Sequence, residues 1–585
     1  MTDARHDAHD AYFLTRAGRR LTQKQADRRR FMQGMLASGA LAGFGLTPLR
    51  AAAQATPAAA TATTYGTNAE PYDGPLADEQ VMRLAIEEPT TLDPAVSYGE
   101  DGDLHILFNT YEGLTGIDQM TGDVVGRVAE SWEANDDSSE FTFTLKPDSQ
   151  WSDGTPITAE DFVYSWRRVL DPNTLSEYMP ALYYLKNGEA IANGEMELDQ
   201  LGVEAVDDTT LKVTLTGPTV FFPRIAATWT YFPVPKHIID ELGDGWTDPG
   251  QQSVSNGPFV MDQWNHDQSI ILVANPNYAA GPAPTLTSAE YTIFEDPTTQ
   301  AFIAFENDEI DYAEPQGPDL DRILEDPSIA GNLIQFPMSN CFFLPCDCSN
   351  PATDSIEFRQ ALWKSFNRDE LANTVLRGQY IPAYTIVSPD IPGSIDGETV
   401  LTESTEEAVA LLEQAGIDPA SVELEITYQN SPARNKTVAE YLQATWQDAL
   451  GITVTLNPIE DTTYIDWRAS RETQPYGVYT GSWGSDFVDP SNWHNQNFTS
   501  QADHYRTHWV NEEYDALCAE AVTNTDEASR IQQYQDAERI LVEESPIIPM
   551  FRGKAVRAVK ENVRDLYFQS TLSLVYLHTV KIAAE

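Results

Sequence analysis

Several short stretches of the chain alternate apolar and polar residues, which is the pattern of a strand with one buried face. This period of two occurs at 141–145, 211–215 and 422–428. Two apolar runs at 257–264 and 269–278 are separated by a short segment that contains the turn-forming residues Asn-His-Asp. That arrangement predicts two strands joined as a β-hairpin.

Other stretches have the 3.6-residue period of amphipathic helices. Thr158 and Asp161 form a capping-box pattern, which satisfies free amide groups at the start of a helix. The apolar residues after this box lie on one helical face: Phe162, Val163, Trp166, Val169 and Leu170. The same period predicts helices at about 356–366, 405–415, 435–449 and 527–544. Because strands and helices interleave irregularly along most of the chain, we predict a mixed α/β (α+β) fold in more than one lobe.

The first 55 residues are organised like an export signal. Consecutive arginines at 28–30 precede a weakly apolar, glycine-rich run at 31–49, and residues 53–55 (Ala-Gln-Ala) suit a signal peptidase. The glycines make the run a poor transmembrane helix, and no cysteine follows it to carry a lipid anchor. We therefore expect a twin-arginine signal peptide at 1–55 and a flexible Ala/Thr/Pro-rich linker at 56–75. The mature protein is expected in the periplasm or at the cell surface.

The chain is strongly acidic. Its 90 acidic and 36 basic residues give a formal charge of −54. Loss of the signal, with nine basic and four acidic groups, makes this −54 − (9 − 4) = −59. Such a charge argues against binding to nucleic acids and to anionic membranes. Because the excess is spread along the chain, we interpret it as a solvated acidic coat suited to saline surroundings.

The cysteines do not indicate an enzyme, and the chain lacks the common catalytic motifs. Four cysteines are too few for a disulfide scaffold, although one disulfide is possible, and Cys346-x-Cys348 is typical of two small core residues. The chain has no G-x-S-x-G, P-loop or H-E-x-x-H sequence. His504 and His508 have the i, i+4 spacing of metal ligands and His494 is near, but ordinary histidines are the more frequent case. We predict no catalytic residues, no metal site and no cofactor.

Residues 129–172 have the sequence AESWEANDDSSEFTFTLKPDSQWSDGTPITAEDFVYSWRRVLDP. This stretch resembles the signature region of the solute-binding proteins of oligopeptide and dipeptide ABC importers, family 5 of the extracellular solute-binding proteins. Further matching stretches follow in the order of that family: FPVPK at 232–236, NGPFVMDQW at 256–264, FENDEID at 305–311, FRQALWKSFNRDEL at 358–371 and GSWGSDFVDP at 481–490. Their common order and spacing make the resemblance specific.

The resemblance implies a two-lobed, hinged periplasmic-binding-protein fold of the large peptide-binding type. It places lobe one at 76–109, 215–339 and 554–585, an inserted subdomain of lobe one at 110–214, and lobe two at 340–553. In such a fold the ligand contacts both lobes and stabilises their closed arrangement.

The resemblance also implies site residues. Asp486 falls where peptide-binding members place the aspartate that pairs with the α-ammonium of the ligand, beside Trp483 and Ser482. Without the resemblance, Asp486 would be an ordinary turn residue before a helix. Tyr164 matches a tyrosine that packs on the ligand, and its alternative is a core position. Arg471 and Arg434 match residues that meet the peptide's C-terminal carboxylate, and their alternative is a solvated surface.

We therefore expect a monomeric protein that binds oligopeptides and delivers them to an ABC permease with its ATPases. An oligosaccharide or a nickel-type metal chelate is the alternative ligand within the same fold, and a periplasmic enzyme or chaperone is the alternative class. Some members have a disulfide at the positions that here are Asn340 and Gly484, so that bond cannot form in this chain.

Overall fold

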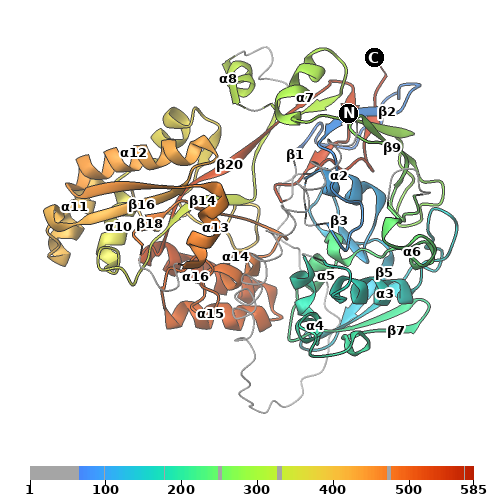
Figure 1. Cartoon of the computed structure of the whole chain (residues 1–585), viewed down its shortest axis with the longest axis horizontal. Helices are drawn as coiled ribbons and strands as arrows, with labels where there is room; N and C mark the ends of the chain where they lie inside the picture. The colour runs from blue at the N-terminus through green and yellow to red at the C-terminus, as the bar shows by residue number, and fades with distance from the viewer. Residues whose placement is uncertain are drawn as a thin grey trace, which may run out of the picture.

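The computed structural model describes residues 65–584 except 98, 100, 177, 248–252, 316, 326–332, 471–475 and 572–573. The predicted signal peptide at 1–55 lies outside this range. Over the described part of the chain, no helix combines the length and apolar character needed to cross a membrane. Two lobes are visible in Figure 1, lobe one in blue and green and lobe two mainly in yellow and orange.

Lobe one contains two four-stranded sheets. The first has the strand order β2 (Val81–Ile86), β11 (Ser288–Ile293), β10 (Ser269–Ala274), β9 (Phe259–Asn265). The second has the order β5 (Ala129–Ala134), β6 (Glu140–Leu145), β8 (Thr210–Thr214), β7 (Val203–Asp207). The predicted hairpin of β9 and β10 and the alternating strands β6 and β8 are confirmed. Their inward-facing residues contribute to two hydrophobic cores of this lobe.

Helix α3 (Ala159–Leu170) covers the second sheet and begins at the predicted capping box. The carboxylate of Asp161 accepts the backbone N–H of Thr158 at 2.7 Å. The apolar face of α3 is buried as the periodicity predicts, and the indole of Trp166 donates to the carbonyl of Tyr231 at 2.9 Å. Smaller helices of lobe one are α2 (Asp101–Thr110), α4 (Gly188–Ala192), α5 (Phe222–Ile225), α6 (Lys236–Leu242), α7 (Pro297–Glu306), α8 (Gly317–Glu325) and the 3₁₀-helix η2 (Met179–Tyr184).

Lobe two combines a parallel sheet with two groups of helices. The sheet has β16 (Glu423–Gln429) between β17 (Thr453–Ile459) and β18 (Val478–Tyr479). Around it lie α10 (Ile356–Lys364), α11 (Thr405–Ala415), α12 (Ala433–Leu450) and α13 (Asp461–Ser470). The second group is α14 (Ser491–Asn497), α15 (Glu512–Thr523) and α16 (Glu527–Glu544). The predicted strand at 422–428 and the four helices predicted in this lobe are confirmed to within about two residues.

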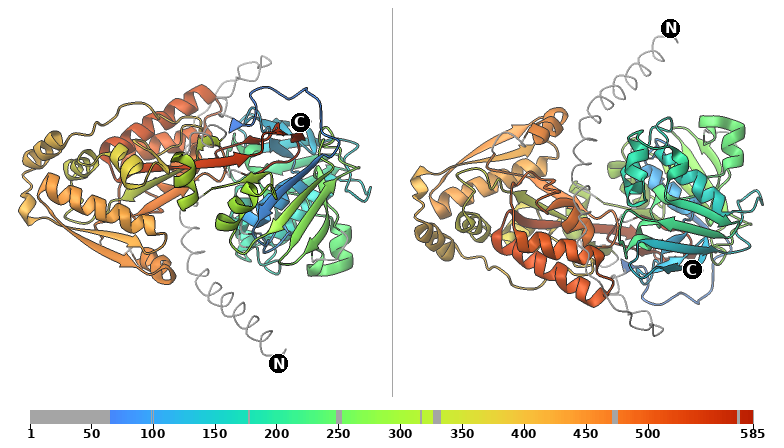
Figure 2. Two further views of the ribbon diagram at one scale, coloured as in Figure 1. Left: turned by 90° about the horizontal axis from the view of Figure 1, so that it is seen from above. Right: turned by 90° about the horizontal axis from the view of Figure 1, so that it is seen from below.

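One long strand, β20 (Ile547–Val559), belongs to both lobes. Its first half pairs with β14 (Asn340–Pro345) and β15 (Tyr380–Pro382), and its second half pairs with β12 (Tyr312–Ala313) and β13 (Leu333–Pro337). Figure 2 shows this red strand passing from one lobe into the other. The residue limits expected for the lobes stay a prediction.

The switch between the two halves occurs at Gly553. Its carbonyl accepts the N–H of Met338 at 2.9 Å, and its N–H donates to Oδ1 of Asn340 at 2.7 Å. A Cβ on Gly553 would lie 2.9 Å from the amide nitrogen of Asn340. A larger residue at 553 would therefore displace the side chains of Asn340 and Met338, and with them the hydrogen bond from Gly553 to Asn340.

The predicted flexible linker at 56–75 is wrong for its described end. Tyr65–Gly66 forms β1, which pairs with β22 (Tyr567–Phe568). The Tyr65 ring stacks on Phe336 at a centroid distance of 4.8 Å. The Ala/Thr/Pro composition concealed this aromatic anchor, because composition does not record packing against a distant strand. Two further short strand pairs are β3 (Thr115–Ile117) with β4 (Val124–Gly126), and β21 (Val563–Arg564) with β23 (Lys581–Ile582).

All four cysteines are free thiols. Cys346 is fully buried and Cys348 is half-buried, so the C-x-C sequence belongs to the core of lobe two. Burial raises the pKa of the Cys341 thiol to about 12, and the thiolate needed for disulfide exchange is disfavoured.

Two buried charged side chains hold the loop that follows β15. Arg552 of β20 donates to the carbonyls of Thr385, Ile386 and Val387 at 2.9–3.1 Å. The carboxylate of Glu538 on α16 accepts the N–H groups of Ile386 and Val387 at 2.9 and 2.8 Å. Burial is the main cause that raises the pKa of Glu538 to about 7.

Glu538 is expected to make folding stability depend on pH. Its pKa is higher in the folded protein (about 7) than the ~4.3 of an unfolded chain. Its contribution to stability is therefore complete below the unfolded pKa and is lost as the pH rises through about 7. Glu538→Gln should reduce the loss of unfolding free energy between ~pH 4.5 and ~pH 7.5 by about 3 kcal/mol, measured by urea denaturation. Glu543→Gln, an exposed change on the same helix, is the control; identical pH slopes for wild type and Glu538→Gln would contradict the assignment.

A disulfide is expected to form if the two positions noted above are both changed to cysteine. Asn340 and Gly484 lie opposite each other on β14 and β19 (Gly481–Gly484). A Cβ at Gly484 would be 3.7 Å from that of Asn340, inside the range of about 3.5–4.5 Å that a disulfide requires. When the oxidised Asn340→Cys/Gly484→Cys variant is denatured and its free thiols are titrated, only the four thiols of the native chain should react. We expect a stabilisation of about 2–4 kcal/mol.

Two additional thiols in the oxidised double variant would contradict this register. Asn340→Cys alone is the control, because it loses the hydrogen bond to Gly553 without gaining a partner.

Candidate ligand-binding site

Strand β19 is the last strand of its sheet and lies beside β14. Trp483 is opposite Cys341, and Ser482 is opposite Phe342. Since successive side chains of a strand point to opposite faces, the two predicted site residues diverge. Trp483 packs against the core that contains Cys341, with its ring 5.7 Å from that of His504. The exposed Ser482 lies on the other face and lines a pocket of lobe two.

Asp486 lies in the loop between β19 and α14. Its backbone N–H donates to Oδ1 of Asn492 at 2.9 Å, and the Asn492 amide donates to its carboxylate at 3.1 Å. The second carboxylate oxygen accepts the phenol of Tyr178, from lobe one, at 3.1 Å. Burial raises the pKa of Asp486, and the bonds from Asn492 and Tyr178 partly oppose this effect. The carboxylate is thus held between the lobes by neutral donors.

The alternative for Asp486 was the structural role of a turn residue before a helix. The nearby Asp489 has such a role. It accepts two hydrogen bonds from the guanidinium of Arg530, at 2.6 and 2.9 Å, and both side chains are buried. Asp489 also accepts the N–H of Ser491 at the start of α14 at 2.9 Å. Asp489 therefore anchors the loop to α16, and Asp486 is left with no cation among the partners that the structure records for it.

Further contacts connect the lobes around this loop. Phe487 stacks on Phe221 of lobe one, with centroids 5.7 Å apart and planes inclined by 11°. Gln496 of α14 donates to the phenol of Tyr184 in η2 at 3.3 Å. The Asp486 loop therefore lies where ligand contacts to both lobes are possible.

The pocket beside Ser482 has a volume of about 200 Å³ and contains two arginines. Arg434, near the start of α12, donates to the Tyr380 phenol at 3.0 Å and lies 4.1 Å above the ring of Phe342. Arg468 of α13 lies 2.9 Å from Nε2 of His504. We call this site the arginine pocket; its remaining lining is Gln429, Pro432, Asn435, Val438, Tyr464, Tyr479, Thr480, Gly481, Tyr505, Met550 and Phe551.

Two further predicted site residues are Tyr164 and Arg471, and only Tyr164 is among the described residues. Tyr164 is on α3, and Lys236 of α6 lies 5.3 Å from its ring centroid. This contact and its packing are within lobe one, which agrees with the alternative of a helix-face position. Arg471 lies outside the described residues.

Two residues of the candidate site, Tyr178 and Arg468, were not predicted from the sequence. Tyr178 follows α3 in a loop without periodicity, and Arg468 is three residues before the predicted Arg471. Their importance depends on contacts with chain segments far away, which no local pattern encodes. The proximity of Arg468 to a predicted residue is the one signal that pointed towards it.

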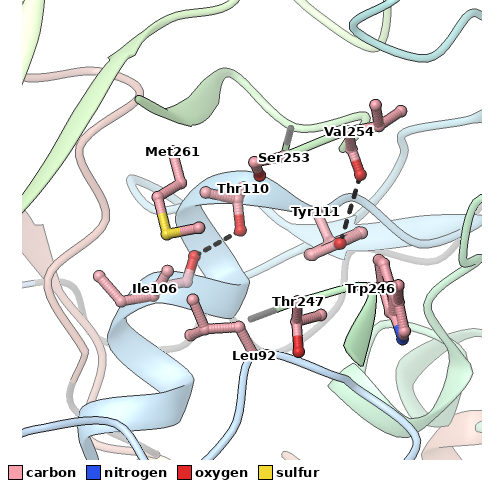
Figure 3. A pocket seen from close by; sticks show the side chains of 9 residues that line it. All are labelled: Leu92, Ile106, Thr110, Tyr111, Trp246, Thr247, Ser253, Val254 and Met261. Carbon is pink, nitrogen blue, oxygen red and sulfur yellow. Dashed lines mark hydrogen bonds between the residues drawn. The ribbon is translucent and has the colours of Figure 1, made fainter. Parts of the chain in front are cut away.

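A second, much smaller cavity of about 20 Å³ lies in lobe one (Figure 3). The Thr110 hydroxyl donates to the Ile106 carbonyl at 2.8 Å, and the Tyr111 phenol to the Val254 carbonyl at 3.5 Å. The lining, with Leu92, Trp246 and others, contains no charged side chain. This cavity has room for one water molecule and does not suit a solute.

The histidines and tryptophans of the described chain are arranged differently from a metal or sugar site. His494, His504 and His508 contact separate partners, Tyr514, Arg468 and Asp347, at 2.9 Å each. No group of three metal-ligating side chains is present in the described residues. Eight of the twelve tryptophans are buried in hydrophobic cores, so few indole faces are open for stacking on a sugar.

Comparison with known proteins agrees with this geometry. Residues 123–505 match the middle region of the bacterial extracellular solute-binding proteins, family 5. The chain is 33% identical over 523 residues to the probable deoxycholate-binding periplasmic protein YgiS of Escherichia coli, covering 88% of this chain and 96% of YgiS. It is 30% identical to the oligopeptide-binding protein OppA of Bacillus subtilis, covering 83% and 89%.

Among solved structures, the unliganded open form of the murein tripeptide-binding protein MppA superimposes with a TM-score of 0.78 and 28% identity, covering 88% of this chain and 99% of MppA. The similarity thus extends over both lobes and the strand that joins them. From the family match, the overall identity and the shared two-lobed fold, the chain belongs to family 5 of the bacterial extracellular solute-binding proteins.

Proposed function

We propose that the protein captures oligopeptides between its two lobes outside the cytoplasm and delivers them to an ABC import permease. The observation that carries this proposal is the Asp486 carboxylate, which is half-buried between the lobes and bound by the neutral donors Asn492 and Tyr178. Relatives named as oligopeptide-binding proteins match most of the chain. Export by the twin-arginine route, without a cysteine anchor, and a monomeric state are parts of the same proposal.

A peptide α-ammonium suits this carboxylate for an electrostatic reason. A carboxylate that is partly removed from water and has no recorded cationic partner is disfavoured in its charged form, which the raised pKa of Asp486 expresses. An ammonium group would donate a charge-assisted hydrogen bond, about twice as strong as a neutral one. Tyr178 of lobe one donates to the same carboxylate, so lobe one would also contact this end of the ligand. The ligand's N-terminus would therefore connect the two lobes and favour their closure.

The peptide backbone would extend along β19. No other described strand pairs with the outer edge of β19, and an edge strand presents backbone donors and acceptors to an added strand. Ser482 and Trp483 would thus contribute mainly through their backbone, with the Trp483 indole packed as a wall behind it. Backbone pairing is compatible with many side chains, as transport of mixed peptides requires.

Replacing Asp486 by asparagine tests the ammonium contact. Asp486→Asn keeps the size of the side chain and removes its charge, so peptides with a free amine should bind about 10–100-fold more weakly. The same peptides with an acetylated N-terminus should change little, because they have no ammonium to lose. Isothermal titration calorimetry gives the ratio of variant to wild-type affinity for the free and for the acetylated peptide. The exposed Asp262→Asn is the control variant. Equal losses for free and acetylated peptides would refute the role of Asp486.

An amphipathic carboxylate is the competing ligand class, since YgiS is named for deoxycholate and the arginine pocket has guanidinium groups beside aromatic rings. A ligand of this class has no ammonium, and its affinity would be the same in wild type and Asp486→Asn. Native mass spectrometry of the protein as purified distinguishes the classes by the mass of the retained ligand.

A further inference from the structure

The arginine pocket lies on one face of the sheet, next to the proposed path of the peptide. Phe551, Phe342 and Ser482 are neighbours in register on β20, β14 and β19, and all three line the pocket. The rings of Phe551 and Phe342 stack with centroids 5.1 Å apart. A strand added at the edge of β19 would continue this row. One of its side chains would then project on the same face as Ser482, towards the pocket.

The groups around the pocket favour an anion. Arg434 and Arg468 enter it from different helices, α12 and α13, and none of its described lining residues is acidic. The N-terminal residues of α12, including Pro432 and Asn435, also line it. The N-terminus of this 18-residue helix adds partial positive charge. Such a concentration of positive groups is unusual in a chain with a formal charge of −54.

Both guanidinium groups have neutral side chains among the partners that hold them in place. Arg434 is fixed by the Tyr380 phenol and the Phe342 ring. Arg468 lies against Nε2 of His504 and 5.6 Å from the ring centroid of Tyr505. Burial lowers the pKa of His504 to about 3, so this imidazole is neutral and accepts from Arg468. Preorganised donors lose little entropy when a ligand binds.

We propose that the arginine pocket binds the carboxylate of an acidic side chain of the peptide, and that the protein consequently prefers acidic peptides. This inference rests on the proposed function, because it requires a peptide extended along β19. A glutamate side chain fits a volume of about 200 Å³, and its two oxygens match the paired N–H donors of a guanidinium. A lysine side chain would bring a like charge beside both arginines.

The geometry favours a side chain over the C-terminal carboxylate as the occupant. Side chains stand perpendicular to a sheet, whereas the chain end continues along the strand direction. The pocket extends from Ser482 across the sheet face to Phe551, perpendicular to the strands. The C-terminal carboxylate would reach it only if the backbone turned out of the sheet.

The test is a scan of tetra-alanine peptides that carry a single glutamate, glutamine or lysine at position 2, 3 or 4. Titration calorimetry at constant ionic strength gives the dissociation constant of each peptide. We expect one position at which the glutamate peptide binds about 10–100-fold more tightly than its glutamine counterpart. The lysine peptide should be the weakest at that position. C-terminal amidation should leave the ratio of glutamate to glutamine affinities intact.

Variants of the pocket connect this preference to the arginines. Arg468→Gln and Arg434→Gln should each bring the ratio of glutamate to glutamine affinities close to one, and Arg468→Lys should restore part of it. Arg539→Gln is the matched control, because Arg539 lies on α16 and pairs with Glu398 at 2.7 Å outside the pocket. Circular dichroism confirms that each variant is folded.

The outcomes separate this inference from the proposed function. If alanine peptides bind but glutamate and glutamine peptides are equal at every position, the acidic preference is refuted while peptide capture stands. A different result would be tight binding that is lost on C-terminal amidation of the peptide but not on exchange of its glutamate for glutamine. This result would show that the pocket holds the chain end and would overturn the proposal. If no peptide binds, the proposed function fails, and the acidic preference fails with it.

Discussion

The backbone pairing of β20 is the constraint on which the rest of the structure depends. This strand forms hydrogen bonds with β14 in lobe two and with β13 in lobe one, so each lobe is built on one half of the same extended segment. A strand shared in this way fixes the relative position of the lobes along the strand itself. The angle between the lobes then depends on further contacts, such as those that a ligand can supply. Gly553 lies within this strand, where its backbone N–H and carbonyl form hydrogen bonds with Asn340 and Met338.

The site at β19 follows from the same arrangement. Since β14 pairs with β20 on one side and β19 on the other, the edge strand and the Asp486 loop are brought beside lobe one. Two aspartates three residues apart then acquire different roles from their surroundings. Asp489 has a buried arginine partner and anchors the loop, whereas Asp486 has neutral partners and a raised pKa. A half-buried carboxylate without a counter-charge is unfavourable for folding, and in the proposed function the ligand supplies the missing cation.

Local periodicity was sufficient to predict most elements. The capping box of α3, the hairpin of β9 and β10, and helices α10, α11, α12 and α16 have buried faces that repeat at 2 or 3.6 residues, and these repeats depend only on neighbours in the chain. The flexible linker failed at Tyr65, because its ring is anchored by a strand from the other end of the chain. For the site, the family resemblance indicated Asp486, Ser482 and Arg434. Only the fold could show that Asp486 lies between the lobes and that Ser482 and Arg434 line one pocket.

The sequence by itself determined the fold class, the family resemblance and the acidic composition, since these depend on residue counts, spacing and short-range pattern. The tertiary structure decided which tyrosine meets Asp486 and which second arginine accompanies Arg434. Tyr178 and Asp486 are separated by 308 positions in the chain, and Tyr164 faces Lys236 instead. Such contacts arise from how sheets and helices pack against one another, and packing between distant segments leaves no period in the residues on either side.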